Sequence, residues 1–421
     1  MTLRSLVVSL LTLALVLADG TARCGVIVVD PAGGPGGAAL LQSAIDSAQP
    51  GDILLLRPGD YSSAPGSHPK VVDKSLALVL DGPPGSVVLS GLRLEAAAAG
   101  TVMLVRGLHV APAPDMGLPS AAVEAVGGVV PWFEDCTFTG SSIGGGATSG
   151  LLSGCATQTL VRCTITGADG ADEVAGVSPA GSGADGARLE LIPFAASIHE
   201  CTMHGGRGGD GDPFVAGGTL YATGGAGLYF TFGLDASIMG SHLLGGDEGD
   251  NNPAETYPGP GPRLVISNVN LRDTEVQAGA VHGAGTPMVD IHIIYKATID
   301  YYPASTRGLS VPSPLREGQG SQIHAHGENG DAVWIYLGLT TGLDPVYDAQ
   351  GNFVLGGVLP AAPIFLGTIG ASGLLDYAFT MPDLPSGMDG FLIYMQSVMT
   401  PVAGGYLLGS GTALVWIDQA L

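Results

Sequence analysis

Positive charge is scarce in this 421-residue chain. Lysine occurs only three times, and 15 Lys and Arg residues face 38 Asp and Glu residues, so the formal net charge is −23. So acidic a surface repels phosphate backbones, and we expect no nucleic-acid partner. It also repels anionic polysaccharides unless divalent cations bridge the negative charges.

Charged residues are also few, whereas the two poorest helix formers are abundant. Charged residues make up 13% of the chain, about half the usual share. The 68 glycines and 29 prolines argue against a helical bundle, because these residues form helices worst. Disorder is excluded by the 46% hydrophobic content, and collagen by the lack of a strict three-residue glycine period. A β-rich protein with many turns remains, large enough for more than one domain.

The N-terminus predicts export. Residues 1–22 match a secretory signal peptide, with Arg4 before an apolar run, Leu6 to Leu17, that is too short to span a bilayer. Cys24 would carry the lipid of a lipoprotein, but Arg23 stands where such a site needs a small residue. No later run reaches 18 apolar residues, so we expect no transmembrane helix and a secreted or cell-surface protein.

Short strand-like segments recur between about residues 87 and 275. Each alternates apolar and polar residues, and most precede glycine-rich sequence. When the segments are aligned, their second residues form one column, which contains Leu92, Leu108, Cys136, Cys163, Cys201, Ser241 and Val269. Most of these residues are 27 to 40 positions apart, which predicts a β-solenoid with loop insertions.

Stacked coils place equivalent residues above one another, about 4.8 Å apart. Cys136, Cys163 and Cys201 then share one interior column, and we interpret them as small apolar packing residues. Metal binding is the alternative, although no CxxC pair or neighbouring histidine pair supports it. The outward His204 and His242 are two positions off a common column and are interpreted as surface residues.

Asp135, Arg162 and Glu200 precede the three cysteines on successive coils. Neighbouring opposite charges stabilise a sheet by roughly 0.2–1 kcal/mol per pair, so a charge ladder on a solvated face is one interpretation. An acid–base–acid trio on a rigid scaffold is also a candidate catalytic site. Both interpretations stay open at this point.

Residues 28–61 contain a specific pattern. An amphipathic helix is predicted over Leu41–Ala48, followed by a Pro50–Asp52 turn, a buried strand from Ile53 to Arg57, and an ending at Pro58–Tyr61. This pattern resembles the first coil of exported bacterial right-handed parallel β-helix proteins of the pectate-lyase-like superfamily. The resemblance implies a helix that shields the apolar end of the solenoid, and a β-helix over residues 23–285.

The chemistry of that superfamily matches less well. The Asn-x-Asp, Asp-Asp, Gly-His-Gly and Arg-x-Lys motifs of its polygalacturonase branch are missing. Its pectate lyases hold Ca²⁺ with carboxylates on one sheet and use an Arg or Lys as base. Arg162, Arg188 and Arg207 are the cations near the acidic loops of this chain.

Three acidic glycine-rich loops leave the coils at corresponding points. Carboxylates and free carbonyls are the ligands that Ca²⁺ prefers, so Ca²⁺ is the one cofactor that the sequence suggests. The candidate ligands are Asp169, Asp172, Asp210, Asp212, Asp247 and Asp250. They match neither the EF-hand spacing nor the nine-residue repeat of Ca²⁺-binding β-rolls, and solvated turns are the alternative.

Residues 286–421 predict a C-terminal β-sandwich. Short strands such as 332–337, 391–396 and 412–417 alternate with turns, and the length suits one domain. Trp334 and Trp416 lie in these strands and are expected in the core, although either could stack on a sugar ring. Surface attachment, secretion sorting and glycan contact are all compatible roles.

The missing hydrolase motifs favour a non-catalytic β-helix protein that is polysaccharide-associated, through glycan binding or a structural surface role. The alternative is a Ca²⁺-dependent polysaccharide lyase of the pectate-lyase type, with Asp135, Arg162 and Glu200 as its catalytic residues. A third hypothesis makes the β-helix a spacer and assigns binding to the C-terminal domain.

Overall fold

The computed structural model describes most of the chain. The described ranges are 24–31, 37–62, 68–112, 121–143, 146–172, 180–190, 194–210, 222–231, 234–249, 258–265, 267–280, 290–295, 297–302, 305–345, 349–358 and 363–421. The predicted signal peptide and two candidate Ca²⁺ ligands, Asp212 and Asp250, lie outside these ranges.

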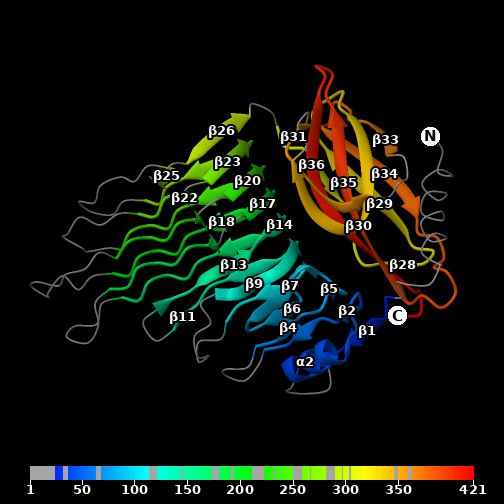
Figure 1. The fold of residues 1–421 in the computed structure, drawn as a ribbon, viewed down its shortest axis with the longest axis horizontal. Coiled ribbons are helices and arrows are strands. Elements are labelled where there is room, and N and C mark those ends of the chain that lie inside the picture. Colours follow the sequence, from blue (N-terminus) through cyan, green and yellow to red (C-terminus); the bar gives the residue numbers. More distant parts are fainter. Residues whose placement is uncertain are drawn as a thin grey trace, which may run out of the picture.

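The larger part of the molecule is a parallel β-helix with three columns of strands (Figure 1). The first sheet contains β1 (Val26–Val29), β2 (Ile53–Leu56), β5 (Leu76–Leu80), β7 (Leu92–Arg106), β9 (Ala121–Glu134), β14 (Thr157–Val161), β17 (Phe194–His199), β20 (Leu234–Met239), β23 (Ser267–Arg272) and β26 (Thr298–Tyr302). The second sheet shares the long strands β7 and β9 and adds β4 (Lys70–Val72), β13 (Ser149–Cys155), β16 (Ala187–Leu189), β19 (Leu228–Phe230), β22 (Pro262–Val265) and β25 (His292–Tyr295).

The third sheet turns back from the first after a short bend. It contains β3 (Gly59–Asp60), β6 (Val87–Leu89), β8 (His109–Val110), β10 (Thr137–Thr139), β15 (Thr164–Thr166), β18 (Thr202–His204), β21 (His242–Leu244) and β24 (Glu275–Gln277). A small hairpin of β11 (Ser142–Ile143) and β12 (Gly146–Ala147) projects beside it. All pairings within the three sheets are parallel, which confirms the predicted β-helix.

The predicted interior column is confirmed at its centre. Cys136, Cys163 and Cys201 are at most 1% exposed and belong to one apolar core. The predicted ends of the column are wrong, because Leu92 pairs with Val123 in the second sheet and Val269 pairs with Ala236 in the first. Apolar alternation is the same in every sheet of a solenoid, so the pattern could not tell which sheet those two segments join.

A left-handed residue makes the bend between the first and third sheets on successive coils. The φ angles at these positions lie between 46° and 79°, for Gly107, Asp135, Arg162, Glu200, Gly240 and Asp273. Where the next residue is Cys, Ser or Thr, it donates its thiol or hydroxyl to a carbonyl two residues back, as from Cys201 to His199 at 3.2 Å and from Ser241 to Met239 at 3.0 Å. Cysteine and serine therefore serve one repeated turn geometry.

The predicted helix is present as α2 (Gly37–Ser47). Its apolar residues Leu41 and Ile45 are buried in the core of the β-helix. Lys74 donates its ammonium to the carbonyls of Ile45, Asp46 and Ala48 at 2.7–3.0 Å, which satisfies the free acceptors at the helix C-terminus.

Glycine-rich segments extend from the coils in two layers, and Figure 1 shows them running side by side away from the strands. The outgoing layer contains residues 167–172, 205–210 and 245–249, and the returning layer contains 180–186, 222–227 and 258–261. Gly206 donates to Ala184 and Gly225 donates to Gly206, each at 2.8 Å, so hydrogen bonds link the layers.

These contacts explain why the segments are so rich in glycine. A Cβ on Gly206 would lie 1.8 Å from the carbonyl oxygen of Ala168, and one on Gly209 would lie 2.0 Å from that of Ala171. The crowded positions recur every three residues, which fits the three-residue turn of a polyproline-II helix. The third residue of each triplet points away from the layers and can be charged.

The C-terminal region contains two sheets in which most strand pairs are antiparallel. A three-stranded sheet contains β27 (Gly308–Ser310), β29 (Gly320–His326) and β34 (Leu374–Thr380). A seven-stranded sheet contains β28 (Leu315–Arg316), β30 (Ala332–Pro345), β31 (Ala349–Gln350), β32 (Asn352–Val358), β33 (Ile364–Thr368), β35 (Gly390–Thr400) and β36 (Tyr406–Ile417). Residues of both sheets, including the predicted core residue Trp416, share one apolar cluster. The parallel coils continue through Tyr302, beyond the predicted boundary at residue 285.

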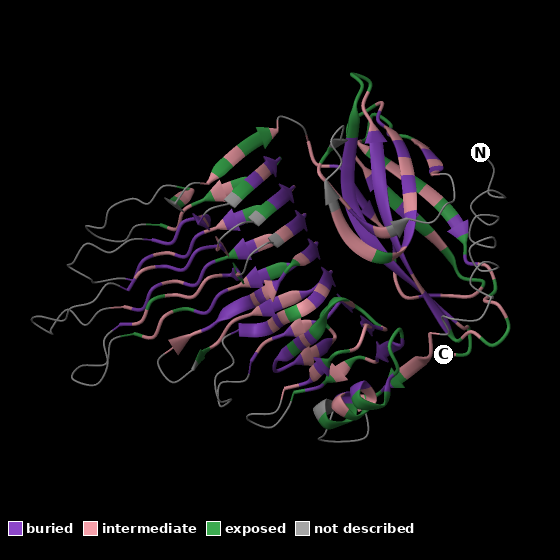
Figure 2. Ribbon diagram, in the orientation of Figure 1, coloured by how far each residue is buried: buried purple, intermediate pink, exposed green. Residues whose placement is uncertain are grey.

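A second apolar cluster joins this C-terminal domain to the outer face of the first sheet. Ile53, Leu55 and Trp132 of the β-helix lie in one cluster with Tyr394 and Val415. Strand β2 is therefore buried on both faces, which explains its uninterrupted apolar sequence. Figure 2 shows β35 and β36 as mainly buried, whereas the end strand β26 is mainly exposed.

Candidate functional site

The linker into the C-terminal domain, residues 305–316, runs along the column of left-handed bends. We call it the strap. The amide and hydroxyl of Thr306 donate to Asp273 at 2.8 Å, Arg162 donates to the carbonyl of Leu309 at 3.2 Å, and Arg106 donates to that of Val311 at 2.7 Å. The predicted catalytic trio lies on this column, so the strap covers the positions that the sequence placed on a solvated face.

The structure brings two members of that trio together. Arg162 Nε lies 2.7 Å from a carboxylate oxygen of Asp135. Glu200 lies one coil further on, where its nearest ion-pair partner is the imidazole of His326 at 3.8 Å. Asp135 is partly exposed, and of the two acids only Glu200 lines the pocket described below.

Glu134, which the sequence analysis missed, is the centre of the charged cluster. Its side chain is fully buried and pairs with both Arg106 and Arg162. It also accepts hydrogen bonds from the indole of Trp132 at 3.1 Å and from the amide of Ala413 in the C-terminal domain at 2.7 Å. An acid at an outward position next to the apolar run 131–133 was the available signal in the sequence.

The charges around Arg162 decide its protonation. Burial lowers the pKa of Arg162, but the carboxylates of Glu134 and Asp135 outweigh burial and hold the pKa above its ordinary value. A guanidinium held in this state donates hydrogen bonds and remains charged, which is unsuited to accepting a proton from a substrate.

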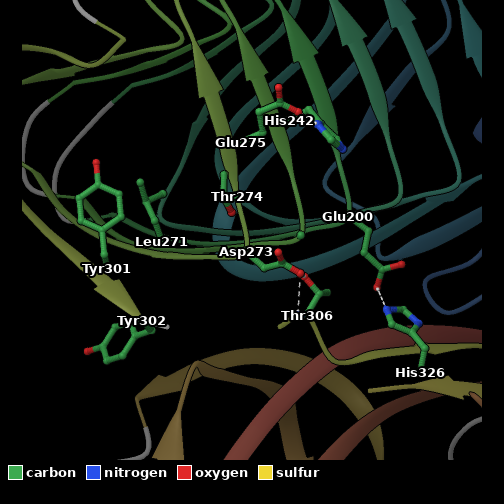
Figure 3. Close-up of a pocket in the computed structure, with 11 residues that line it drawn as sticks. Glu200, His242, Leu271, Asp273, Thr274, Glu275, Tyr301, Tyr302, Thr306 and His326 are labelled. Atoms are coloured by element: carbon green, nitrogen blue, oxygen red, sulfur yellow. Dashed lines mark hydrogen bonds and ion pairs between the residues drawn. The ribbon is translucent and has the colours of Figure 1, made fainter. Parts of the chain in front are cut away.

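A polar pocket of about 640 Å³ lies where the last coils meet the strap, and we call it the junction pocket (Figure 3). Figure 3 shows His242 beside Glu275, with the two groups 2.7 Å apart, and Glu200 beside His326. The exposed His242 confirms its predicted outward position. Tyr301 lies at the far end of the pocket.

A second hollow, of about 620 Å³, follows the outer face of the second sheet beside the returning glycine layer, and we call it the groove. Arg188, Tyr229 and Arg263 occupy the same register position on three neighbouring strands. The guanidinium carbons of Arg188 and Arg263 lie 5.0 and 5.7 Å from the centre of the Tyr229 ring. Two cations are therefore stacked on one tyrosine in a chain that has few cations.

Carboxylates accompany these arginines. Glu190 forms an ion pair with Arg188, and Asp185 accepts a hydrogen bond from the amide of Ala226 at 2.9 Å. Burial raises the pKa of Asp185, while the Ala226 amide and the charges of Arg263 and Arg188 act in the opposite direction.

Of the four candidate Ca²⁺ ligands that the structure describes, Asp210 pairs with the guanidinium of Arg207, and the other three accept hydrogen bonds from backbone amides. Asp169 accepts from Arg207 at 2.7 Å, Asp172 accepts from Asp210 at 2.9 Å, and Asp247 accepts from Ala280 at 2.6 Å. Each carboxylate thus links its own segment to the following one. In the part of the chain that the structure describes, no three His, Cys, Asp or Glu side chains are grouped closely enough to hold a metal ion.

Comparisons with known proteins add little to this geometry. A scan of family models found no match, and a search of curated proteins found none either. Several solved structures are similar in part. Pectate lyase Pel9A is 13% identical over 68% of this chain and 80% of its own, with a TM-score of 0.31. A PL6 family alginate lyase, AlyGC, is 10% identical over 67% of this chain, with a TM-score of 0.28.

Another similar structure is a superoxide reductase, neelaredoxin, from Ignicoccus hospitalis, which is 11% identical over 27% of this chain and 81% of its own, with a TM-score of 0.16. This chain spans about two fifths of the alginate lyase, or 41%. At such low TM-scores the fold assignment rests on the strand register, which defines a parallel β-helix of the kind that the pectate-lyase-like resemblance implied. Among the described helices, none has the length and apolarity needed to cross a bilayer.

Proposed function

We propose that this protein is an exported, non-catalytic β-helix protein that binds an acidic polysaccharide along the groove. The observation that carries the proposal is the stack of Arg188, Tyr229 and Arg263. Guanidinium groups bind carboxylates through paired hydrogen bonds, and they do so more specifically than lysine.

The spacing of the stack suits a chain of charged sugars. Arg188 and Arg263 are two strands apart, which separates them by about 9.6 Å along the solenoid. Tyr229 lies between them and holds both in place, at about 0.5–1 kcal/mol for each exposed cation–π contact. This local cationic stack supplies the attraction that the net charge of −23 otherwise opposes.

Titration calorimetry with a polyuronate, with and without Ca²⁺, tests this function. We expect binding without Ca²⁺, and we expect the Arg263→Ala variant to weaken it at least about tenfold, because one charge-assisted pair is lost. Arg207→Ala, on the outgoing glycine layer, is the matched control and should bind normally. Equal affinity of the Arg263 variant and the native protein would overturn the proposal.

A Ca²⁺-dependent lyase is the second candidate, and the groove favours it through Asp185, a carboxyl group of raised pKa beside two arginines. For Asp135 and Arg162, we infer an anchoring role under the strap in place of catalysis. A rise in ultraviolet absorbance from unsaturated sugars, dependent on Ca²⁺ and lost in Asp185→Asn, would establish the lyase. Of the six candidate aspartates in the loops, Asp169 and Asp172 would then be replaced first to test them as Ca²⁺ ligands.

Four finer features belong to this proposal. We infer that residues 1–22 direct export and are removed, and that α2 shields the apolar end of the solenoid. We also infer that the two C-terminal sheets form a β-sandwich, since their inward residues share one core. The right-handed sense of the coils follows the general rule for parallel crossovers.

A further inference from the structure

Among the described residues, three arginines are buried where the strap and the C-terminal domain cover the solenoid. Arg106 pairs with Glu134. Arg307 pairs with Asp331, at 2.7 Å. Arg272, the last residue of β23, is 2% exposed, and no carboxylate of the described residues lies within ion-pair distance of it. Of the three buried guanidinium groups, this one alone has no counter-charge from a neighbouring side chain.

The contacts of the Arg272 guanidinium are with neutral groups. One terminal nitrogen donates to the side-chain oxygen of Gln350 at 2.8 Å, and the other lies 3.7 Å from the sulfur of Met239. The Nε–H is buried and donates to no described residue. The next acid in the chain, Asp273, instead accepts from the amide and hydroxyl of Thr306, as Figure 3 shows. One buried donor and one positive charge therefore have no protein partner.

The surroundings of Arg272 add to this excess of positive charge. Burial lowers the pKa of Arg272 to about 10, and the charge of Arg307 acts in the same direction. The Tyr302 ring, 5.9 Å from the guanidinium carbon, supplies only a cation–π contact. Two strands away at the same register position, His199 is fully buried, and its Nδ1 also has no described partner. Burying a charge without a counter-ion is costly, so an anion bound at this place stabilises the folded protein.

We propose that the interface between the solenoid and the C-terminal domain binds a small monovalent anion of the halide class, which accepts the Nε–H of Arg272. The low exposure of Arg272 excludes a sugar, and one negative charge balances one guanidinium. Gln350 is exposed, so the ion can exchange with solvent at the edge of the interface. This site is separate from the groove and does not depend on the function proposed there.

Thermal melts of the full chain test this assignment, with chloride replacing gluconate at constant ionic strength so that general screening stays the same. We expect chloride to raise the melting temperature of the native protein by about 2–5 °C, because a ligand of the folded state alone stabilises it. Arg272→Met removes the charge and the donor and should abolish this response. Arg93→Met is the matched control and should retain it, because Arg93 is an exposed arginine of the solenoid.

A second measurement needs no variant. A crystal of the native protein grown with bromide should show an anomalous peak beside Nε of Arg272.

The proposal is overturned if chloride leaves the native melting temperature unchanged, if Arg272→Met or the Arg93→Met control responds in the opposite way to that expected, or if the bromide peak is missing. Circular dichroism shows that each variant is folded before its melt is compared. Arg263→Ala should respond to chloride as the native protein does, which keeps failure at this site distinct from failure in the groove.

Discussion

The first and second sheets of the β-helix share one apolar interior, but their outer faces lie in different surroundings. The outer face of the first sheet packs on the C-terminal domain, so outward residues such as Leu55 and Val79 are as apolar as inward ones. The outer face of the second sheet borders the groove and presents Arg188, Tyr229 and Arg263. The interior specifies the coil, and the outward residues determine what each face contacts.

Removing the buried acid at the covered face is expected to have the largest effect. In Glu134→Ala, Arg106 and Arg162 lose their shared partner in a buried place, so we expect a loss of about 3–5 kcal/mol in the free energy of unfolding. Chemical denaturation measures it. Glu124→Ala removes the ion pair with the exposed Arg93 and should change stability little. Similar effects of the two variants would contradict the anchoring role.

The glycine layers offer the next test, because close contacts between their backbones hold them together. Gly206→Ala places a Cβ against the backbone of Ala168, and we expect destabilisation by about 1–3 kcal/mol. Gly370→Ala, where the added Cβ meets nothing within 4 Å, is the control. The melting temperatures of both variants test this expectation. An unchanged melting temperature for the Gly206 variant would show that the layers are packed loosely enough to accept a side chain.

A pH series probes the polar part of the covered face. Burial, with Arg272 and Arg162 nearby, lowers the pKa of His199 to about 3, while an unfolded histidine has a pKa of about 6.5. As pH falls below about 6.5 the unfolded chain binds a proton that the folded chain does not, so stability decreases until pH reaches about 3. At pH 5 the loss is about 2 kcal/mol at most.

Comparing His199→Asn with the native protein isolates this contribution. Denaturation midpoints at pH 7 and pH 5 should differ less in the variant, because the proton-binding group is gone. The exposed His204→Asn serves as control and should retain the native pH dependence. If the His199 variant also retained the native pH dependence, groups other than His199 would be responsible for the change of stability with pH.

The smallest effect is expected in the interior column. Cys163→Ser should cost less than about 1 kcal/mol, because Ser241 already occupies an equivalent position and donates to the same kind of carbonyl. A metal chelator should leave the melting temperature unchanged. A large drop with chelator would revive metal binding by the cysteines.

Much of the fold could be predicted from local patterns. The helix at residues 37–47 and the cysteine column follow from the spacing of apolar residues, and the strand at 53–56 follows from its uninterrupted apolar run. The predicted ends of the column failed at Leu92 and Val269, because alternation does not record which of the three sheets a strand joins. The loop aspartates were assigned as candidate Ca²⁺ ligands, and their bonds to backbone amides could not be seen in the sequence.

By itself, the sequence determined that the chain coils, because repeated apolar residues can be buried only by stacking. Tertiary structure alone decided the roles of the charged residues. Asp135 and Arg162 lie under the strap because residues 305–316 return along the bends. Arg188 and Arg263 meet on one tyrosine because their coils have equal register, although 75 positions separate them in the chain. Charges act over a few ångströms in space, and the one-dimensional order of residues does not contain those distances.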